Sequence, residues 1–200
     1  MLIYMVRHGQ TDWNAESRFQ GQKDIPLNAL GRAQASGNGL ALKEILGDQI
    51  DRFDFVASPL GRTRETMQRL RSSIGLEPNL YNTDERLLEV CFGDWEGFTT
   101  RELRKLYPEK VAARIADKWG FIPPGQGAES YEILSWRVGS WLASVERPTV
   151  CVSHGGVMRS ILKMVGGVTP EEACGLHIAQ DRILRVDRDA GEVRWLDPES

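Results

Sequence analysis

The sequence predicts an α/β fold, a three-layer sandwich whose mostly parallel sheet carries helices on both faces and a capping insertion. Three short, largely apolar runs each end abruptly in polar residues, at positions 2–6, 53–57 and 149–152. Continuous apolar runs of this length are typical of strands that are covered on both faces. Segments with helical spacing lie between them. Strand followed by helix, repeated along the chain, favours a parallel sheet with right-handed crossovers.

The helical segments are indicated by apolar residues that recur at threes and fours, which places them on one helix face. They are the stretch around 30–40, the stretch 63–74 and the stretch 130–145. Near the C-terminus, 183–186 and 192–196 are separated by Asp189-Ala190-Gly191 and predict a closing hairpin.

The stretch 78–127 is less regular than the rest. Pro123-Pro124-Gly125 marks a loop after a helical segment at about 100–119. The stretch is too short to be a separate domain. We therefore predict one domain, 1–200, with an insertion at about 97–127 over the active site.

Charge and composition argue against several classes of partner. The chain has 25 basic and 28 acidic side chains and a net charge of -3, so no general field attracts nucleic acid or an anionic membrane. Basic residues do not gather around the tryptophans Trp95, Trp119, Trp136 and Trp141, which we expect in the core or in a pocket wall. A homodimer remains open.

Cysteine usage and the N-terminal residues indicate a cytoplasmic protein. The three cysteines have no regular spacing, which is unlike a disulfide framework or a zinc site. The apolar stretch 1–6 is too short to span a membrane and lacks the basic segment of a signal peptide.

The candidate chemistry lies at the ends of the three apolar runs. Arg7 and His8 follow the first run, His154 follows the third, and Arg62 comes shortly after the second. In open α/β sheets, ligands bind beyond the carboxyl ends of the strands. We therefore expect these two imidazoles and two guanidiniums to converge on one crevice.

A basic pocket inside an acidic protein indicates an anionic ligand, and phosphate is the natural candidate. Arginine matches phosphate oxygens with two parallel hydrogen bonds. Backbone N–H groups at the helix starts after Gly61 and Gly155 could add donors. Glycines at 9, 61, 155 and 156 would let the backbone approach the ligand.

The residues 7–14 read RHGQTDWN, which resembles the RHGxTxxN signature of the histidine phosphatase (phosphoglycerate-mutase-like) superfamily. Further segments resemble, in order, the stretches that follow this signature in the family; they are 19–35, 58–66, 87–97 and 153–156. The resemblance extends from about Leu2 to Arg159. It implies a phosphomonoester hydrolase that acts through a phosphohistidine.

Carried over position by position, the resemblance makes His8 the nucleophile and Glu89 the proton donor to the leaving alcohol, and later the base for water. Arg7, Arg62 and His154 would hold the phosphoryl oxygens. Four further residues are implied in substrate binding, namely Thr11, Asn14, Gln20 and Gly155.

This division of roles is physically reasonable. A histidine nucleophile must be neutral at one ring nitrogen, with the other N–H held by an acceptor such as a backbone carbonyl near Gly9. Arg7, Arg62 and a protonated His154 would supply the charge that phosphoryl transfer needs, without a metal or another cofactor. Bound phosphate should repel a carboxylate, so we expect Glu89 to be a competent acid chiefly when substrate is present.

Some assignments stay open. Nearby carboxylates could replace Glu89 as the acid; they are Glu85, Asp94 and Glu96. A surface or structural role is expected for His177. The basic residues Arg101, Arg104 and Lys105 fit a solvated helix face as well as a substrate clamp.

The reaction also has alternatives, namely phosphoglycerate mutase-type transfer or non-catalytic binding of a phosphorylated ligand. The insertion lacks the adjacent arginine pair of cofactor-dependent mutases. The chain is also shorter than those enzymes, and both points favour hydrolysis. The sequence does not name the substrate, and we expect specificity to reside at about 99–127.

Overall fold

The computed structural model describes residues 1–196 and contains one six-stranded mixed sheet. Its strands lie in the order β3 (Asn82–Thr83), β2 (Asp54–Ala57), β4 (Thr149–Ser153), β1 (Leu2–Arg7), β5 (Ile183–Asp187), β6 (Glu192–Leu196). The first four are mutually parallel, whereas β5 pairs antiparallel with β1 and β6 antiparallel with β5. The mostly parallel sheet and the closing hairpin are confirmed.

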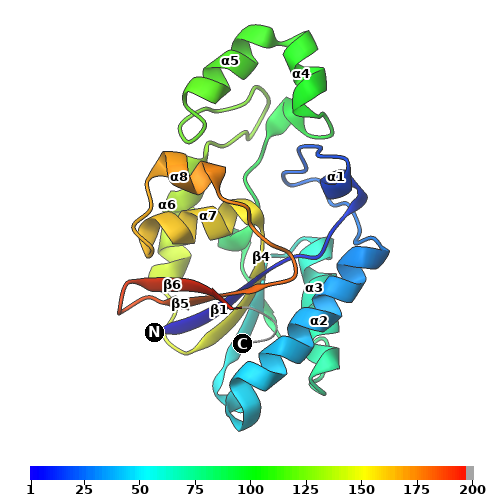
Figure 1. The fold of residues 1–200 in the computed structure, drawn as a ribbon, viewed down its shortest axis with the longest axis vertical. Coiled ribbons are helices and arrows are strands. Elements are labelled where there is room, and N and C mark those ends of the chain that lie inside the picture. The colour runs from blue at the N-terminus through cyan, green and yellow to red at the C-terminus, as the bar shows by residue number, and fades with distance from the viewer. Residues whose placement is uncertain (197–200) are drawn as a thin grey trace.

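Helices cover both faces of the sheet (Figure 1). One layer contains α2 (Ala29–Leu46) and α3 (Gly61–Ser73), and the opposite layer contains α6 (Tyr131–Ala143), α7 (Gly155–Met164) and α8 (Pro170–Gly175). The predicted three-layer α/β sandwich is therefore confirmed.

Side chains along β1 alternate between the two layers. Ile3 and Met5 belong to the core cluster on the α6–α7 side, whereas Tyr4 and Val6 belong to the cluster on the α2–α3 side. Successive side chains of a strand point to opposite faces. Because both faces are buried, the strand reads as a continuous apolar run.

The insertion forms two short helices at one end of the molecule, α4 (Thr100–Leu106) and α5 (Pro108–Ala116) (Figure 1). Thr99 and Glu102 form a reciprocal capping box at the start of α4. The single helical segment expected at 100–119 is divided because Pro108 has no N–H to continue α4 and suits the first turn of a new helix.

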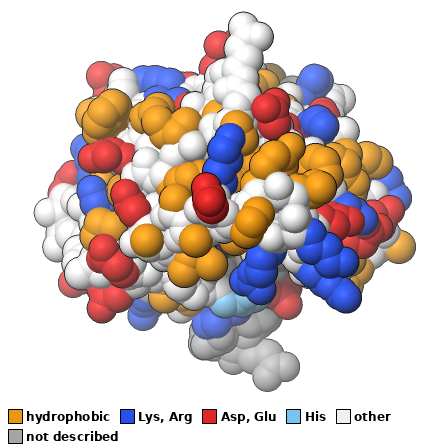
Figure 2. Space-filling model, turned by 90° about the horizontal axis from the view of Figure 1, so that it is seen from above, with side chains coloured by type: hydrophobic (Ala, Val, Ile, Leu, Met, Phe, Trp, Pro, Cys, Tyr) orange, Lys and Arg blue, Asp and Glu red, His pale blue; other side chains and the backbone are white. Residues whose placement is uncertain are grey.

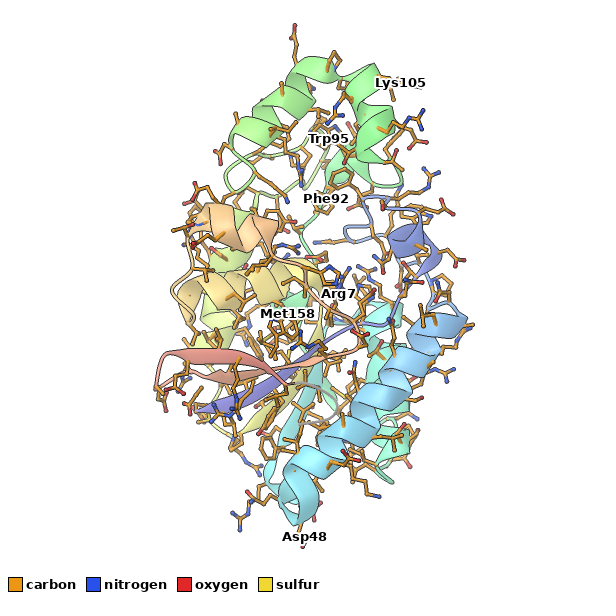
Figure 3. All side chains as sticks on the ribbon, in the orientation of Figure 1. Arg7, Asp48, Phe92, Trp95, Lys105 and Met158 are labelled. Carbon is orange, nitrogen blue, oxygen red and sulfur yellow. The ribbon has the colours of Figure 1, made fainter. Side chains whose placement is uncertain are left out.

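Aromatic packing anchors the insertion to the rest of the chain. The Phe19 and Phe92 rings are 4.8 Å apart, and Trp95 is 5.3 Å from Phe121, measured between ring centroids. Figure 3 shows Phe92 and Trp95 between the α4–α5 pair and the body of the molecule.

The backbone also joins the N-terminal loop to the insertion. Phe19 N donates to Phe98 O, and Gly97 N donates to Phe19 O. We call residues 18–23 the hinge loop, because the insertion and the sheet end both contact it.

Several short elements were not predicted: α1 (Asp12–Ala15), α8, β3 and the 3₁₀ turns η1 (Gly47–Arg52), η2 (Glu85–Leu87) and η3 (Gly93–Trp95). Most of them span too few residues for a periodic pattern to emerge. The expectation for Trp136 is wrong, because its side chain is 67% exposed on the outer face of α6, whereas Trp95, Trp119 and Trp141 are buried.

Viewed from the α4–α5 end, acidic and basic side chains intermingle with hydrophobic ones (Figure 2). Across residues 1–196, no helix is both long and apolar enough to cross a membrane.

Candidate active site

Three neighbouring strand ends bring the predicted residues together. Arg7 at the end of β1 pairs with Ser153 at the end of β4. His8 N donates to Ser153 O at 2.9 Å, and on the other side of β4, Ser58 N donates to Val152 O at 3.0 Å. The segments that follow β1, β4 and β2 thus leave the sheet side by side. Figure 3 shows Arg7 between the sheet and the insertion.

The two histidine rings are in edge contact. Their centroids are 5.2 Å apart and their planes are inclined by 62°. His8 is 3% exposed and His154 is fully buried. The two rings are therefore neighbours, as expected, but His8 lines the cavity at this sheet edge whereas the fully buried His154 does not.

The His8 tautomer is set by the backbone. Nδ1 lies 2.8 Å from Gly9 O, and a carbonyl can only accept, so Nδ1 carries the proton and Nε2 keeps its lone pair. Burial first, and then the charges of Arg62 and Arg7, hold the pKa of His8 well below its ordinary value. His8 is therefore a neutral nucleophile candidate.

The protonation of His154 depends on the groups around its ring. Its Nε2 lies 2.8 Å from Ser58 Oγ, and its Nδ1 is buried without a hydrogen-bond partner among residues 1–196. Burial first, followed by the charges of Arg62 and Arg7, lowers the pKa of His154 well below its ordinary value. The surroundings that the protein supplies therefore favour the neutral ring, and the protonated His154 expected from the sequence would need the negative charge of a phosphoryl group beside it.

Main-chain carbonyls hold two arginines of the site, the half-buried Arg7 and the buried Arg62. Arg7 Nη1 donates to Ile178 O at 2.7 Å, and its buried Nε has no partner within the described chain. Arg62 donates to Lys23 O at 2.7 Å and to Gly21 O at 2.6 Å, both in the hinge loop. Burial lowers the pKa of each guanidinium to about 10, so both stay charged at neutral pH.

Gln20 completes the support of Arg62. With its amide oriented to satisfy both neighbours, Gln20 O accepts from Arg62 Nε at 2.7 Å and Gln20 N donates to Thr11 Oγ1 at 2.5 Å. Gln20 lines the cavity, whereas Thr11 is fully buried behind it. Asn14 also lines the cavity, and its Oδ1 accepts from Gln180 Nε2 at 3.2 Å.

The helix-start donors expected to bind phosphate are occupied by carboxylates of the protein. Gly156 N lies 3.1 Å from both carboxylate oxygens of Glu89, and Gly61 N donates to Asp24 at 2.7 Å. The positive end of a helix dipole attracts such groups. A Cβ on Gly156 would lie 2.2 Å from Glu89 Oε1, so glycine here makes room for the carboxylate rather than for a ligand.

The structure separates Glu89 from the other candidate acids. Glu89 lines the cavity. Glu96 is buried and accepts from the backbone N–H groups of Gln22 and Phe92, while Glu85 and Asp94 are exposed. Of these four carboxylates, only Glu89 faces the cavity.

Arg137 on α6 holds the loop that carries Glu89, and no motif in the sequence indicates this role. Nη1 donates to Leu88 O at 2.6 Å and Nη2 to Glu89 O at 3.0 Å. Its Nε donates to Glu129 Oε1 at 2.9 Å, and Glu129 Oε2 accepts from the backbone of Cys91 at 3.1 Å. This ion pair fixes the main chain on both sides of Glu89.

A cavity of about 700 Å³ is lined by the predicted residues Arg7, His8, Asn14, Gln20, Arg62 and Glu89, whereas His154 does not line it. The lining also includes residues that the sequence analysis did not single out, namely Arg114, Lys118, Tyr131, Arg159 and Gln180. His177 lies exposed at its rim and Gly155 lines it. Arg159 follows His154 by little more than one helical turn, a spacing that could have indicated it. Arg101, Arg104 and Lys105 are exposed and lie outside the lining.

Metal-ligating side chains do not gather at the site. Within residues 1–196, no three His, Cys, Asp or Glu side chains form a group that could hold a metal ion.

The two buried histidines should make stability depend on pH. Their pKa values are held low in the folded protein by burial and by neighbouring arginines. The unfolded chain therefore binds more protons as pH falls below about 6.5. We expect the free energy of unfolding to fall below this pH by up to about 1.4 kcal/mol per unit per histidine.

Urea unfolding between pH 7.5 and 5.5 measures this slope. His8→Asn and His154→Asn should each flatten it relative to the unsubstituted chain. Equal slopes in all three proteins would contradict the assignment of neutral buried rings.

Comparison with known proteins agrees with the geometry. The profile of the histidine phosphatase superfamily (branch 1) matches residues 3–198. The probable phosphoglycerate mutase GpmB of Escherichia fergusonii is 36% identical over 98% of this chain and 88% of its own length. An uncharacterized phosphatase, PhoE, of Bacillus subtilis is 32% identical over 84% of this chain and 79% of its own.

Solved structures show the same fold. The alpha-ribazole phosphatase of Shigella flexneri has a TM-score of 0.80 at 25% identity, covering 96% of this chain and 93% of its own. A mycobacterial glucosyl-3-phosphoglycerate phosphatase has a TM-score of 0.73 at 30% identity, covering 98% and 96%. With a matching profile over nearly its whole length and paired histidines at its strand ends, the chain belongs to the histidine phosphatase superfamily.

Proposed function

We propose that the protein hydrolyses phosphomonoesters of small metabolites through a phosphohistidine on His8. The observation that carries this proposal is a histidine whose Nδ1 is held by Gly9 O, which leaves Nε2 as a neutral nucleophile beside two buried guanidiniums. Relatives named as phosphatases support it.

The first half-reaction transfers the phosphoryl group to the protein. His8 Nε2 attacks phosphorus and the bond to the ester oxygen breaks, while Glu89 protonates the departing alcohol. Arg7 and Arg62 stabilise the negative charge on the phosphoryl oxygens. Both side chains are held by backbone carbonyls before substrate arrives, so little reorganisation is needed.

The second half-reaction restores the enzyme. Glu89, now a carboxylate, takes a proton from water, which attacks phosphorus and breaks the bond to His8. Inorganic phosphate leaves. The charge comes from guanidiniums, so the proposed reaction needs neither a metal ion nor a cofactor.

Hydrolysis of 4-nitrophenyl phosphate with and without EDTA tests this proposal. We expect turnover that chelation does not change. Activity that depends wholly on an added divalent metal would contradict the phosphohistidine route.

Mutase-type transfer is the second candidate, because a relative over nearly the whole chain is a probable phosphoglycerate mutase. The proposal favours hydrolysis because the insertion lacks the adjacent arginine pair of cofactor-dependent mutases, and the cations that it places in the cavity wall, Arg114 and Lys118, are not adjacent in sequence. Transfer of phosphate between the oxygens of phosphoglycerate that is faster than phosphate release would establish the mutase instead.

A further inference from the structure

A second group of cations lines the cavity, apart from the arginines that face His8. It consists of Arg114, near the end of α5, Lys118, just beyond α5, and Arg159 of α7. We call these three residues the outer cationic cluster. Two come from the insertion and one from the helix that begins after His154, so the cluster exists only in the folded chain.

The outer cationic cluster has no carboxylate partner within residues 1–196. Arg159 Nη2 donates to Leu176 O at 2.8 Å, and Lys118 Nζ donates to Cys174 O at 2.7 Å. The Arg114 guanidinium lies 5.0 Å from the centre of the Phe19 ring. Arg159 Nε is buried without any hydrogen-bond partner in the same part of the chain.

Arg18, another cation of the cavity wall, differs from the outer cationic cluster because it has carboxylate partners. Arg18 also lines the cavity, but it forms ion pairs with Glu16 at 2.6 Å and with Glu102 at 3.1 Å. The charge of Arg18 is thus compensated by carboxylates of the protein. Among the described residues that line the cavity, Glu89 is the only acidic one.

The three cations also repel one another. Burial first, together with the charge of Arg159, lowers the pKa of Arg114. Burial, then the charges of Arg114 and Arg159, lower the pKa of Lys118. Like charges in a partly buried wall destabilise the fold unless an anion compensates them.

At Gly155, Arg159 of the outer cationic cluster comes close to Arg7 of the site. A Cβ on Gly155 would lie 3.1 Å from Arg159 Nη1 and 3.6 Å from Arg7 Nε. The guanidiniums of Arg159 and Arg7 therefore lie next to each other beside Gly155, where no side chain separates them. A ligand that touches both needs only a short spacer between its two charged groups.

We propose that the outer cationic cluster binds a second anionic group of the substrate, a carboxylate or a further phosphate on the alcohol portion. This inference rests on the proposed hydrolase function and narrows its substrate class. The favoured substrates are short phosphomonoesters with an additional negative charge, and neutral alcohol phosphates are poor ones.

A matched pair of substrates tests the inference. 3-Phosphoglycerate and glycerol 3-phosphate differ by a carboxylate in place of a hydroxymethyl group. Hydrogen bonds to charged groups are among the stronger ones, so we expect kcat/KM at least about tenfold higher for the acidic member. Propane-1,3-diol bisphosphate, compared with its monophosphate, tests a second phosphate in the same position.

Variants identify the residues responsible. Arg159→Gln and Lys118→Gln should each reduce the ratio of acidic to neutral kcat/KM, by about tenfold for the arginine. Arg101→Gln, an exposed cation of the same insertion, should keep both the ratio and the activity.

The outcomes separate the two proposals. Equal efficiency on both members of each pair, with 4-nitrophenyl phosphate still hydrolysed, would overturn the inference and leave the hydrolase standing. An acidic preference that survives both cluster variants would also overturn it. Failure to hydrolyse any phosphomonoester, the aryl ester included, would overturn the hydrolase itself.

Discussion

His8→Asn is expected to lower kcat for phosphomonoester hydrolysis by about 10⁴-fold or more, the scale of loss when a covalent nucleophile is removed. Asparagine is close to histidine in size, and its amide can still donate to Gly9 O, the acceptor that fixes His8. It lacks the ring nitrogen that attacks phosphorus. The measurement is steady-state kcat together with acid-labile labelling of the protein from a ³²P-labelled substrate.

The chain contains only three histidines, which makes the labelling interpretable. His177→Asn should retain the label, because His177 lies exposed at the cavity rim, away from the buried pair. A His8→Asn protein that still becomes labelled and turns over would assign the nucleophile elsewhere.

Glu89→Gln is expected to slow phosphoenzyme formation by about 10²- to 10³-fold for alkyl phosphates, within the range for loss of a general acid. An alkoxide must be protonated as it leaves, whereas 4-nitrophenolate departs without help, so the aryl ester should lose far less. Rapid-quench measurement of the first turnover isolates this step from hydrolysis of the phosphohistidine.

Two further variants make the test specific. Glu96→Gln removes a neighbouring carboxylate that binds backbone N–H groups instead of facing the cavity, so it should show no dependence on the leaving group. Arg137→Lys removes hydrogen bonds to the main chain that carries Glu89. It should also slow alkyl esters more than the aryl ester, but by a smaller factor than Glu89→Gln does. Equal losses for alkyl and aryl esters in Glu89→Gln would argue against the acid role.

The strands and the centre of the site could be predicted because their signals are local. The buried strand β1 reads as an apolar run, and the polar residues directly after it mark the carboxyl end where ligands bind. The signature around His8 lies within one short segment. Even the break between α4 and α5 has a local signal, since Pro108 is poorly suited to a helix interior.

Other features depend on contacts between distant segments and left no such signal. The sequence predicts that the N–H groups at the helix starts after Gly61 and Gly155 are available to phosphate. In the structure Asp24 and Glu89 accept from them, and these carboxylates come from distant parts of the chain, which a local motif does not show. The charge of His154 depends on its burial, which a sequence does not give. Arg137 matters because folding places the carbonyl of Leu88 within its reach. Arg159 matters because folding places it beside Arg7.

The hinge loop links the insertion, where we expect substrate specificity, to an arginine of the proposed catalytic site. Its main chain hydrogen-bonds to the insertion at Phe19 and orients the Arg62 guanidinium through Gly21 O and Lys23 O. In the proposed hydrolase, the insertion that would contact the alcohol portion and the Arg62 guanidinium that would contact the phosphoryl group are therefore both held by one short stretch of backbone. In the proposed hydrolase we therefore expect an alcohol that displaces the insertion to misalign Arg62 as well, which would lower kcat in addition to raising KM.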